Sequence, residues 1–317
     1  MNKHFSIRRS CPCCKSTRSA TLCKIGYTEP LMKEYLDSFY SPLGEGVEFE
    51  YLEGSYYILN ECKDCGLIYQ EEIPNEFLML KLYEQWIDPQ VILEEHKNNR
   101  NARHFVWVAK EIANVIQYFD TIPGQLNFLD LGMGWGEWCL MAKGLGCDVY
   151  GTEISQARID YAKASGIKVV SWEEIPNHQF DFINTEQVFE HLADPLETLV
   201  HLKRALKPDG VIRINVPNGW DIKRRLEIWD WKAPVGSENS LNLIAPFQHI
   251  NCYTYEVLVK MGQRAGLEVV VIPDQFKTTC LEDRVKAITK RYYNRLRPGR
   301  RRRRGKGTRV FFRNSIG

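Results

Sequence analysis

A chain of 317 residues is long enough to bury a core of ordinary size, and this length predicts two domains or one large domain with an appendage. No stretch of eighteen uncharged apolar residues occurs, and Lys3, Arg8 and Arg9 near the start are followed by no apolar run. This composition argues against a transmembrane helix and a secretory signal. We therefore expect a soluble cytoplasmic protein.

The net charge of +2 conceals a strong asymmetry along the chain. From Arg284 onward there are fourteen Lys and Arg and no Asp or Glu, so the preceding residues hold 28 basic and 40 acidic side chains. An acidic body is unlike a general nucleic-acid binder, because that affinity depends on many phosphate contacts. The basic end includes Arg300 to Arg304 in a loop expected near residues 297–306, and it is either a solvated loop or a contact for an anionic surface.

Cysteines are grouped near the start of the chain, which favours metal binding over disulfides in a reducing compartment. Cys11 and Cys14 form one pair and Cys62 and Cys65 another, each with two residues between its members. Two such pairs supply the four thiolates of a closed, structural zinc site. Cys13 leaves the ligand set ambiguous, and buried free thiols are the alternative. We predict a small zinc-binding module over residues 1–75.

Periodicity divides the rest of the chain. Apolar residues recur at three- and four-residue steps from Phe77 to Phe119, which predicts a helical connector over residues 76–124. Strands then alternate with helices over residues 125–317, which predicts an α/β domain with a doubly wound, mainly parallel seven-stranded Rossmann-like sheet. The expected strands are Asn127 to Leu131, Asp148 to Gly151, Ile167 to Val170, Phe180 to Asn184, Val211 to Val216, Leu267 to Ile272 and Thr308 to Phe312. The expected helices are Glu137 to Lys143, Gln156 to Ala164, Leu196 to Leu206 and Tyr253 to Ala265.

A glycine-rich turn follows the first expected strand of this domain. Gly132, Gly134 and Gly136 come directly after Asp130-Leu131 and before a helix, so the backbone can approach a ligand closely. Glu153 follows the next strand, where an acidic side chain can accept both hydroxyls of a ribose. The glycines fall at every second position, which disfavours the NAD or FAD fingerprint.

Over roughly residues 125–275, these motifs resemble class I S-adenosylmethionine-dependent methyltransferases. The resemblance includes five further segments: Phe180 to Ile183, Glu190 to Pro195, Leu206 to Gly210, Val216 to Asn218 and the later His249. It implies that Asp130 and the glycine turn hold the methionine part of the cofactor and that Glu153 holds its ribose. It also implies that Ser171 and Trp172 contact the adenine, although many relatives have Asp where Ser171 stands.

Methyl transfer requires an aimed nucleophile and a group that takes its proton. His191 and His249 are the candidate bases, because both follow expected strands and a neutral imidazole titrates near pH 7. Structural roles in helix support or core closure are the alternatives. Trp220, Trp229 and Trp231 are a candidate lid over the acceptor or an ordinary aromatic cluster. Quinone-pathway relatives carry a metal-binding Glu where Gln187 stands, which argues against a catalytic metal.

The stretch from Cys62 to Tyr69, with Pro74 and Leu82-Tyr83 after it, looks like the N-terminal module of methyltransferases in bacterial sugar-modification and surface-polysaccharide pathways. We therefore predict an S-adenosylmethionine-dependent methyltransferase with a structural Zn²⁺ that acts on a small hydroxylated acceptor, most simply a sugar, sugar nucleotide or glycan. The alternatives are an RNA methyltransferase, which the acidic body disfavours, and a non-catalytic zinc-scaffolded adaptor, which the complete glycine turn disfavours.

Overall fold

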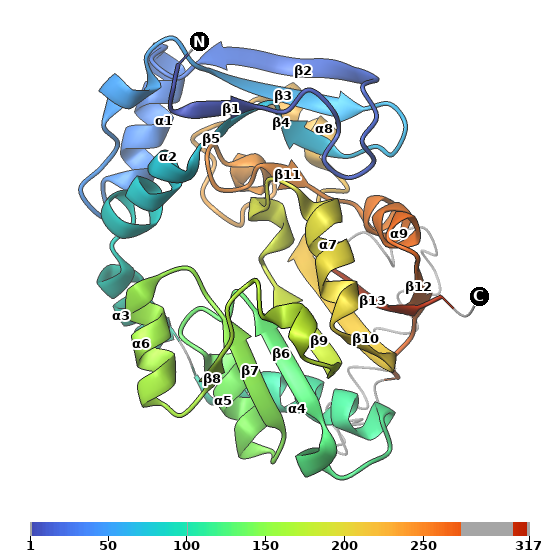
Figure 1. Ribbon diagram of the computed structural model, residues 1–317. Helices are drawn as coiled ribbons and strands as arrows, with labels where there is room; N and C mark the ends of the chain where they lie inside the picture. The colour runs from blue at the N-terminus through green and yellow to red at the C-terminus, as the bar shows by residue number, and fades with distance from the viewer. Residues whose placement is uncertain (1, 100, 274–306, 316–317) are drawn as a thin grey trace, which may run out of the picture.

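A seven-stranded sheet forms the centre of the computed structural model, which describes residues 2–99, 101–273 and 307–315 (Figure 1). The strand order is β12-β13-β10-β9-β6-β7-β8, and only β13 runs antiparallel to its neighbours. The bounds are β6 Asn127–Leu131, β7 Asp148–Thr152, β8 Lys168–Val169, β9 Phe180–Glu186, β10 Leu206–Pro217, β12 Leu267–Val270 and β13 Gly307–Asn314. The predicted α/β fold with a mainly parallel seven-stranded sheet is therefore confirmed.

Helices cover both faces of this sheet, because its central strands carry apolar side chains on both sides. On one face Leu129 and Ile183 pack in a core with residues of α7 and α9. On the other face Phe128 and Phe182 pack with residues of α4 and α5. The helices of this half are α4 Ala102–Tyr118, α5 Glu137–Gly144, α6 Gln156–Ala164, α7 Pro195–Arg204, α8 Ile222–Ile228 and α9 Tyr255–Arg264.

Most predicted elements lie within a few residues of their expected positions. The helix expected from Leu196 to Leu206 ends earlier, because Leu206 already pairs with Phe180 as the first residue of β10. The helix expected from Tyr253 begins at Tyr255, because the Thr254 side chain accepts a hydrogen bond from the backbone N–H of Val257. The strand expected from Thr308 to Phe312 is present within β13, whereas the Arg300 to Arg304 run lies outside the described residues.

The N-terminal region builds a second sheet of order β11-β4-β3-β2 and a small β1-β5 pair. The bounds are β1 Phe5–Ile7, β2 Ser19–Gly26, β3 Tyr56–Cys62, β4 Ile68–Gln70, β5 Glu72–Pro74 and β11 Asn251–Cys252. The strand β11 comes from the segment between β10 and α9, and it pairs antiparallel with β4. The N-terminal sheet thus incorporates a strand from the larger unit, while the domain boundaries at residues 75 and 124 stay predictions.

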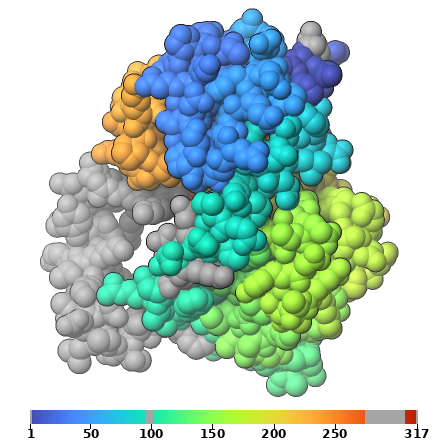
Figure 2. All heavy atoms as spheres, turned by 90° about the vertical axis from the view of Figure 1, so that its left-hand side faces the viewer, coloured from blue at the N-terminus to red at the C-terminus, as the bar shows by residue number. Residues whose placement is uncertain are grey.

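Helices link the two sheets where the sequence predicts a connector. Their bounds are α2 Glu76–Lys81, a π-helical turn at Leu82–Trp86, and α3 Pro89–Asn99, after which α4 follows, whereas α1 Pro30–Tyr40 lies earlier, between β2 and β3. Asn75 caps α2 and Asn101 caps α4, each by accepting hydrogen bonds from backbone N–H groups of the first turn. Figure 2 shows the connector, in cyan, between the blue N-terminal residues and the green half of the molecule. Among the described residues no helix is both long and apolar enough to span a bilayer.

Candidate functional site

The glycine turn lies at the carboxyl end of β6, an inner strand of the sheet between β9 and β7. Gly132, Gly134 and Gly136 have φ values of +65°, +55° and +74°, which is a left-handed backbone that favours glycine. A Cβ at Gly132 would lie 2.9 Å from the Val188 side chain, and one at Gly136 would lie 2.5 Å from Ile167. A Cβ at Gly134 would meet no described atom within 4 Å. The turn is therefore packed at both ends and open at Gly134, where a ligand can approach.

Glu153, directly after β7, closes the turn from the side. Its carboxylate accepts hydrogen bonds from the backbone N–H of Gly134 at 2.9 Å, Ile154 at 2.8 Å and Ser155 at 3.2 Å. The side chain is nearly buried, yet Ile154 beside it is 79% exposed. An anionic acceptor thus stands beside an exposed apolar side chain at the carboxyl edge, which suits a ribose next to a flat base.

Asp130 belongs to a buried polar network that the sequence analysis missed. Asn184 donates a hydrogen bond to the Asp130 carboxylate at 2.7 Å and accepts one from the Arg213 guanidinium at 2.7 Å. Arg213 is 2% exposed and forms ion pairs with Glu111 at 2.8 Å and Glu186 at 2.7 Å. Burial raises the pKa of Asp130 to about 7, against the opposing effect of the Asn184 hydrogen bond. A charged residue inside the apolar strand β10 was the available signal for this network.

Ser171 and Trp172 follow β8 and so lie at the same edge as the turn. The Ser171 backbone N–H donates to the Glu174 carboxylate at 3.0 Å. The Trp172 indole stacks on the His201 ring of α7, with the ring centroids 4.0 Å apart. The neighbouring His201 therefore fixes the indole, and the adenine contact of both residues stays a prediction.

His191 follows β9 and His249 follows β10, and the structure brings the two rings together. The ring centroids are 5.0 Å apart. His191 Nδ1 donates to the Gln248 carbonyl at 2.8 Å, and His249 Nδ1 donates to the Asn242 carbonyl. Because a carbonyl can only accept, each neutral ring carries its proton on Nδ1 and keeps a free lone pair on Nε2. Burial lowers the pKa of His191 to about 3 and also lowers that of His249.

The N-terminal module holds the segment that carries His249. Gln70 of β4 donates from Nε2 to the carbonyls of Ala245 at 3.0 Å and His249 at 3.1 Å. The Tyr40 hydroxyl donates to the Pro246 carbonyl at 3.0 Å, and the Tyr57 hydroxyl to that of Ile244 at 2.8 Å. These buried donors satisfy the carbonyls of an irregular segment. The module therefore positions a candidate catalytic side chain of the larger unit.

Arg8 ties both histidine-bearing segments to the module. Its guanidinium donates to the Gln70 carbonyl at 2.9 Å, to the Ile250 carbonyl at 2.8 Å and to the side-chain oxygen of Asn251 at 2.8 Å. Asn251 in turn donates to the carbonyls of Phe189 at 3.2 Å and Leu192 at 2.7 Å. Hydrogen bonds from Arg8 and Asn251 thus connect the residues near 8, 70, 190 and 250, which no local pattern reveals.

The four predicted zinc ligands come together in the described chain. The sulfur atoms of Cys11 and Cys65 are 3.5 Å apart and those of Cys14 and Cys62 are 3.4 Å apart, and all four lie within 4.8 Å of one another. Four thiolates on one Zn²⁺ at about 2.3 Å stand roughly 3.8 Å apart, so the spacing fits. Cys13 lies outside this set of four and its sulfur faces the Val257 carbonyl at 4.0 Å. The four buried sulfurs therefore suit a closed structural site.

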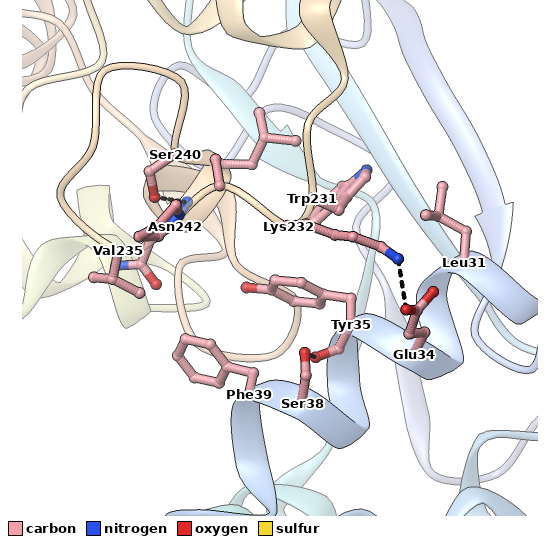
Figure 3. A pocket seen from close by; sticks show the side chains of 13 residues that line it. Leu31, Glu34, Tyr35, Ser38, Phe39, Trp231, Lys232, Val235, Ser240 and Asn242 are labelled. Atoms are coloured by element: carbon pink, nitrogen blue, oxygen red, sulfur yellow. Dashed lines mark hydrogen bonds and ion pairs between the residues drawn. The ribbon is translucent and has the colours of Figure 1, made fainter.

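The predicted aromatic lid packs partly against the N-terminal region. Trp231 is buried, with its ring centroid 4.8 Å from that of Tyr35 on α1, whereas Trp220 is 47% exposed. Figure 3 shows Tyr35, Phe39 and Trp231 around a cavity of about 370 Å³, with Lys232 paired to Glu34 at 2.6 Å. The floor of this cavity includes Asn242, whose carbonyl anchors His249. Asn242 therefore connects the lining of this cavity to the His249 ring that it anchors.

A second cavity of about 490 Å³ opens at the carboxyl ends of β9 and β10. Its wall includes Trp107 of α4, Glu186, Gln187, Asn215 and Arg309. Gln187 has a φ of +55°, a conformation that is uncommon for a side-chain-bearing residue. The polar network around Arg213 reaches this cavity through Glu186, so a ligand here would contact charged groups that are already fixed.

Comparisons with known proteins identify the family of the chain. A family model described as a methyltransferase domain matches residues 85–272, which is more than half of the chain. The ubiquinone biosynthesis O-methyltransferase of Dinoroseobacter shibae is 29% identical over 157 residues, covering 46% of this chain and 61% of that protein. Its counterpart in Bradyrhizobium diazoefficiens is 33% identical over 104 residues, covering 30% of this chain and 41% of that protein. The chain thus spans less than two thirds of these curated relatives.

Solved structures include similar chains at low identity. The plantazolicin methyltransferase BpumL in complex with SAH is 17% identical with a TM-score of 0.47, covering 75% of this chain and 94% of that chain. A TehB-like SAM-dependent methyltransferase from Corynebacterium glutamicum is 16% identical with a TM-score of 0.43, covering 72% and 98%. The family model is the match that decides membership. The chain belongs to the methyltransferase domain family, and residues 85–272 form its methyltransferase domain.

Proposed function

We propose that the protein is an S-adenosylmethionine-dependent methyltransferase that methylates a hydroxyl group of a small acceptor, a sugar, sugar nucleotide or glycan. The observation that carries this proposal is the glycine turn at the end of β6, open at Gly134 and closed by Glu153. The fixed carboxylates of Asp130 and Glu153 fit a cofactor with an ammonium group at one end and ribose hydroxyls at the other. The named relatives are O-methyltransferases of ubiquinone biosynthesis, which supports a hydroxyl acceptor.

Bound S-adenosylmethionine would supply an electrophilic methyl group, so the protein must hold the acceptor in line and take its proton. The acceptor oxygen would take the methyl group from the sulfonium, which would leave as a neutral thioether, and the hydroxyl proton would pass to a group of the protein. We assign the proton to the Nε2 lone pair of His249 or His191. His249 is favoured because the module holds its segment at Gln70 and Tyr40.

We also propose that Cys11, Cys14, Cys62 and Cys65 bind a structural Zn²⁺. The spacing of the four buried sulfurs supports it. Lys260 donates to the Asp64 and Cys65 carbonyls at 3.3 Å, which ties this knuckle to α9. The metal would thus stabilise the module against the methyltransferase domain, and through Gln70 it would support the position of His249.

The acceptor class is tested by incubating the purified protein with S-adenosylmethionine labelled in its methyl group. The panel contains sugar nucleotides, glycans, a simple phenol and RNA. We expect label on a hydroxyl oxygen of a sugar-containing acceptor. Label on the phenol alone would reject the sugar and keep O-methylation, label on RNA alone would favour the RNA methyltransferase, and cofactor binding without transfer to any class would favour the adaptor.

A further inference from the structure

Arg213 is a buried cation in the middle of an apolar strand. It lies within β10 between Ile212 and Ile214, which are both fully buried. Burying a guanidinium costs free energy unless its donors are paired, and a buried ion pair can often be replaced by apolar residues without loss of stability. Arg213 therefore requires an explanation beyond packing.

Three polar side chains stand side by side across the sheet at this level. Asn184 of β9 is the in-register partner of Asp130 on β6 and of Arg213 on β10. Residues paired in this way point to the same face of a sheet, so the three form one row. Asn184 donates from Nδ2 to the Asp130 carboxylate at 2.7 Å, and its Oδ1 accepts from Arg213 Nε at 2.7 Å. The row connects Arg213 to the carboxylate that the proposed function places at the cofactor.

Arg213 determines which end of the Asn184 amide faces Asp130. A guanidinium has only donors, so the amide oxygen faces Arg213 and the amide NH₂ faces the carboxylate. A turned amide would place its oxygen against the Asp130 carboxylate and lose both hydrogen bonds. The contact with Arg213 therefore favours the amide orientation that stabilises an ionised Asp130.

The charge of Arg213 acts on Asp130 in the same direction as the amide. Burial raises the pKa of Asp130 to about 7, while the Asn184 hydrogen bond and the Arg213 cation both lower it. Of the other titratable groups that act on this carboxyl, Glu186 raises its pKa and the Cys139 thiol of α5 lowers it. Without the cation, the pKa of Asp130 would therefore lie higher and less of it would be ionised near pH 7.

Two carboxylates hold the guanidinium at its other nitrogen atoms. Glu111 of α4 accepts from Nη1 at 2.8 Å, and Glu186 at the end of β9 accepts from Nη2 at 2.7 Å. Both carboxylates have a second partner, because Asn215 donates to Glu186 at 2.6 Å and Arg309 pairs with Glu111. Each nitrogen of the guanidinium thus has an acceptor, and the protein alone fixes the position of Arg213.

We propose that Arg213 is a positioning residue of the cofactor site, which acts through Asn184 to keep Asp130 ionised and fixed in orientation for the ammonium group of S-adenosylmethionine. The proposal rests on the proposed function, because the ammonium group belongs to that cofactor. Charge and orientation set before the cofactor arrives reduce what its binding must reorganise. Arg213 acts on the cofactor only through Asp130, since its nitrogen atoms are engaged by other side chains.

Calorimetry of the full chain with two ligands separates this role from a merely structural one. S-adenosylhomocysteine carries the ammonium group, whereas methylthioadenosine has the same ribose and adenine without the amino-acid part. Arg213→Met should weaken binding of S-adenosylhomocysteine by at least about tenfold at pH 7, because an interaction with a charged group is lost. Binding of methylthioadenosine should change by less than about twofold.

The pH dependence provides a second readout. The wild type should bind S-adenosylhomocysteine more tightly as Asp130 ionises. In Arg213→Met this rise in affinity should move to higher pH, because removing the cation raises the pKa of Asp130 and its carboxylate form exists only above that pKa. Arg213→Lys keeps the charge and should recover part of the affinity that Arg213→Met loses.

Asn184→Leu is the second variant, in case Arg213→Met does not fold, because it leaves both ion pairs of Arg213 in place. It should show the same selective loss, and the double variant should bind no more weakly than Arg213→Met if the two residues act in series. Arg225→Met is the matched control, since Arg225 is a largely buried arginine of α8 paired with Asp221 at 3.0 Å. It should bind both ligands like the wild type, and circular dichroism checks the folding of each variant.

Equal affinity for S-adenosylhomocysteine in the wild type and Arg213→Met would overturn the positioning role. An equal loss of affinity for both ligands would also overturn it, because a structural role predicts that result. Either outcome leaves the proposed function standing, whereas a wild type that binds no S-adenosylhomocysteine would reject both. A selective loss in Arg213→Met, in a protein that transfers no methyl group to any acceptor, would support the role of Arg213 and reject the proposed function.

Discussion

His249→Ala is expected to abolish most of the turnover while leaving cofactor binding intact. The substitution removes the His249 ring, whose centroid lies 5.0 Å from that of His191 and whose Nε2 lone pair is proposed to take the proton. It leaves the glycine turn and Glu153, which lie after other strands of the sheet. Positioned proton transfer typically contributes a factor of about 10² to 10⁴, which corresponds to roughly 2.7 to 5.5 kcal/mol of transition-state stabilisation.

The assay compares the rate of turnover on the accepted substrate with the affinity for S-adenosylhomocysteine measured by calorimetry. His178→Ala is the control, because this residue lies before β9 at the far edge of the sheet and stacks on Phe180. Turnover that falls by about two orders of magnitude or more, with cofactor affinity within about twofold, supports the assignment. Near-normal turnover in both His249→Ala and His191→Ala would refute it.

Three further predictions concern other parts of the site. Cys62→Ser should remove about one zinc per chain and lower the melting temperature, and a folded wild-type protein without metal would reject the zinc site. Cofactor affinity should rise roughly tenfold from pH 6 to pH 8, because burial raises the pKa of Asp130 to about 7 and only its carboxylate form attracts the cofactor ammonium. An equal rise in affinity in Asp130→Asn would exclude this cause. Gln70→Leu should lower turnover more than cofactor affinity, because it leaves the backbone carbonyls of Ala245 and His249 without their donor. Unchanged turnover would show that Gln70 does not position His249.

Local patterns predicted the parts of the molecule that local physics determines. The strand Asn127–Leu131 and the helix Gln156–Ala164 have the bounds that their hydrophobic periodicity predicts. The turn after this strand was predictable because its left-handed backbone needs glycine at alternate positions. The two-residue spacing within each cysteine pair likewise predicted that the four sulfur atoms come together, while the zinc itself stays a prediction.

Long-range contacts were not predictable in this way. Nothing near Asn251 and Cys252 indicates that they extend the N-terminal sheet, because strand pairing depends on the partner β4. Arg213 lies within the apolar strand β10, and its ion-pair partners Glu111 and Glu186 come from α4 and β9. The sequence showed that Gln187 departs from the metal-binding glutamate of quinone-pathway relatives. The approach of His249 to His191, by contrast, depends on the fold.

The central claim is that the glycine turn and Glu153 bind S-adenosylmethionine. Calorimetry of S-adenosylhomocysteine with the wild type and Glu153→Ala tests it most directly, with circular dichroism as the check on folding. Loss of a hydrogen bond to a charged group should weaken binding by roughly 1.5 to 3 kcal/mol, or about 10- to 150-fold. Wild-type binding that weakens by this amount in Glu153→Ala agrees with the claim, whereas equal affinities, or no binding by the wild type, would contradict it.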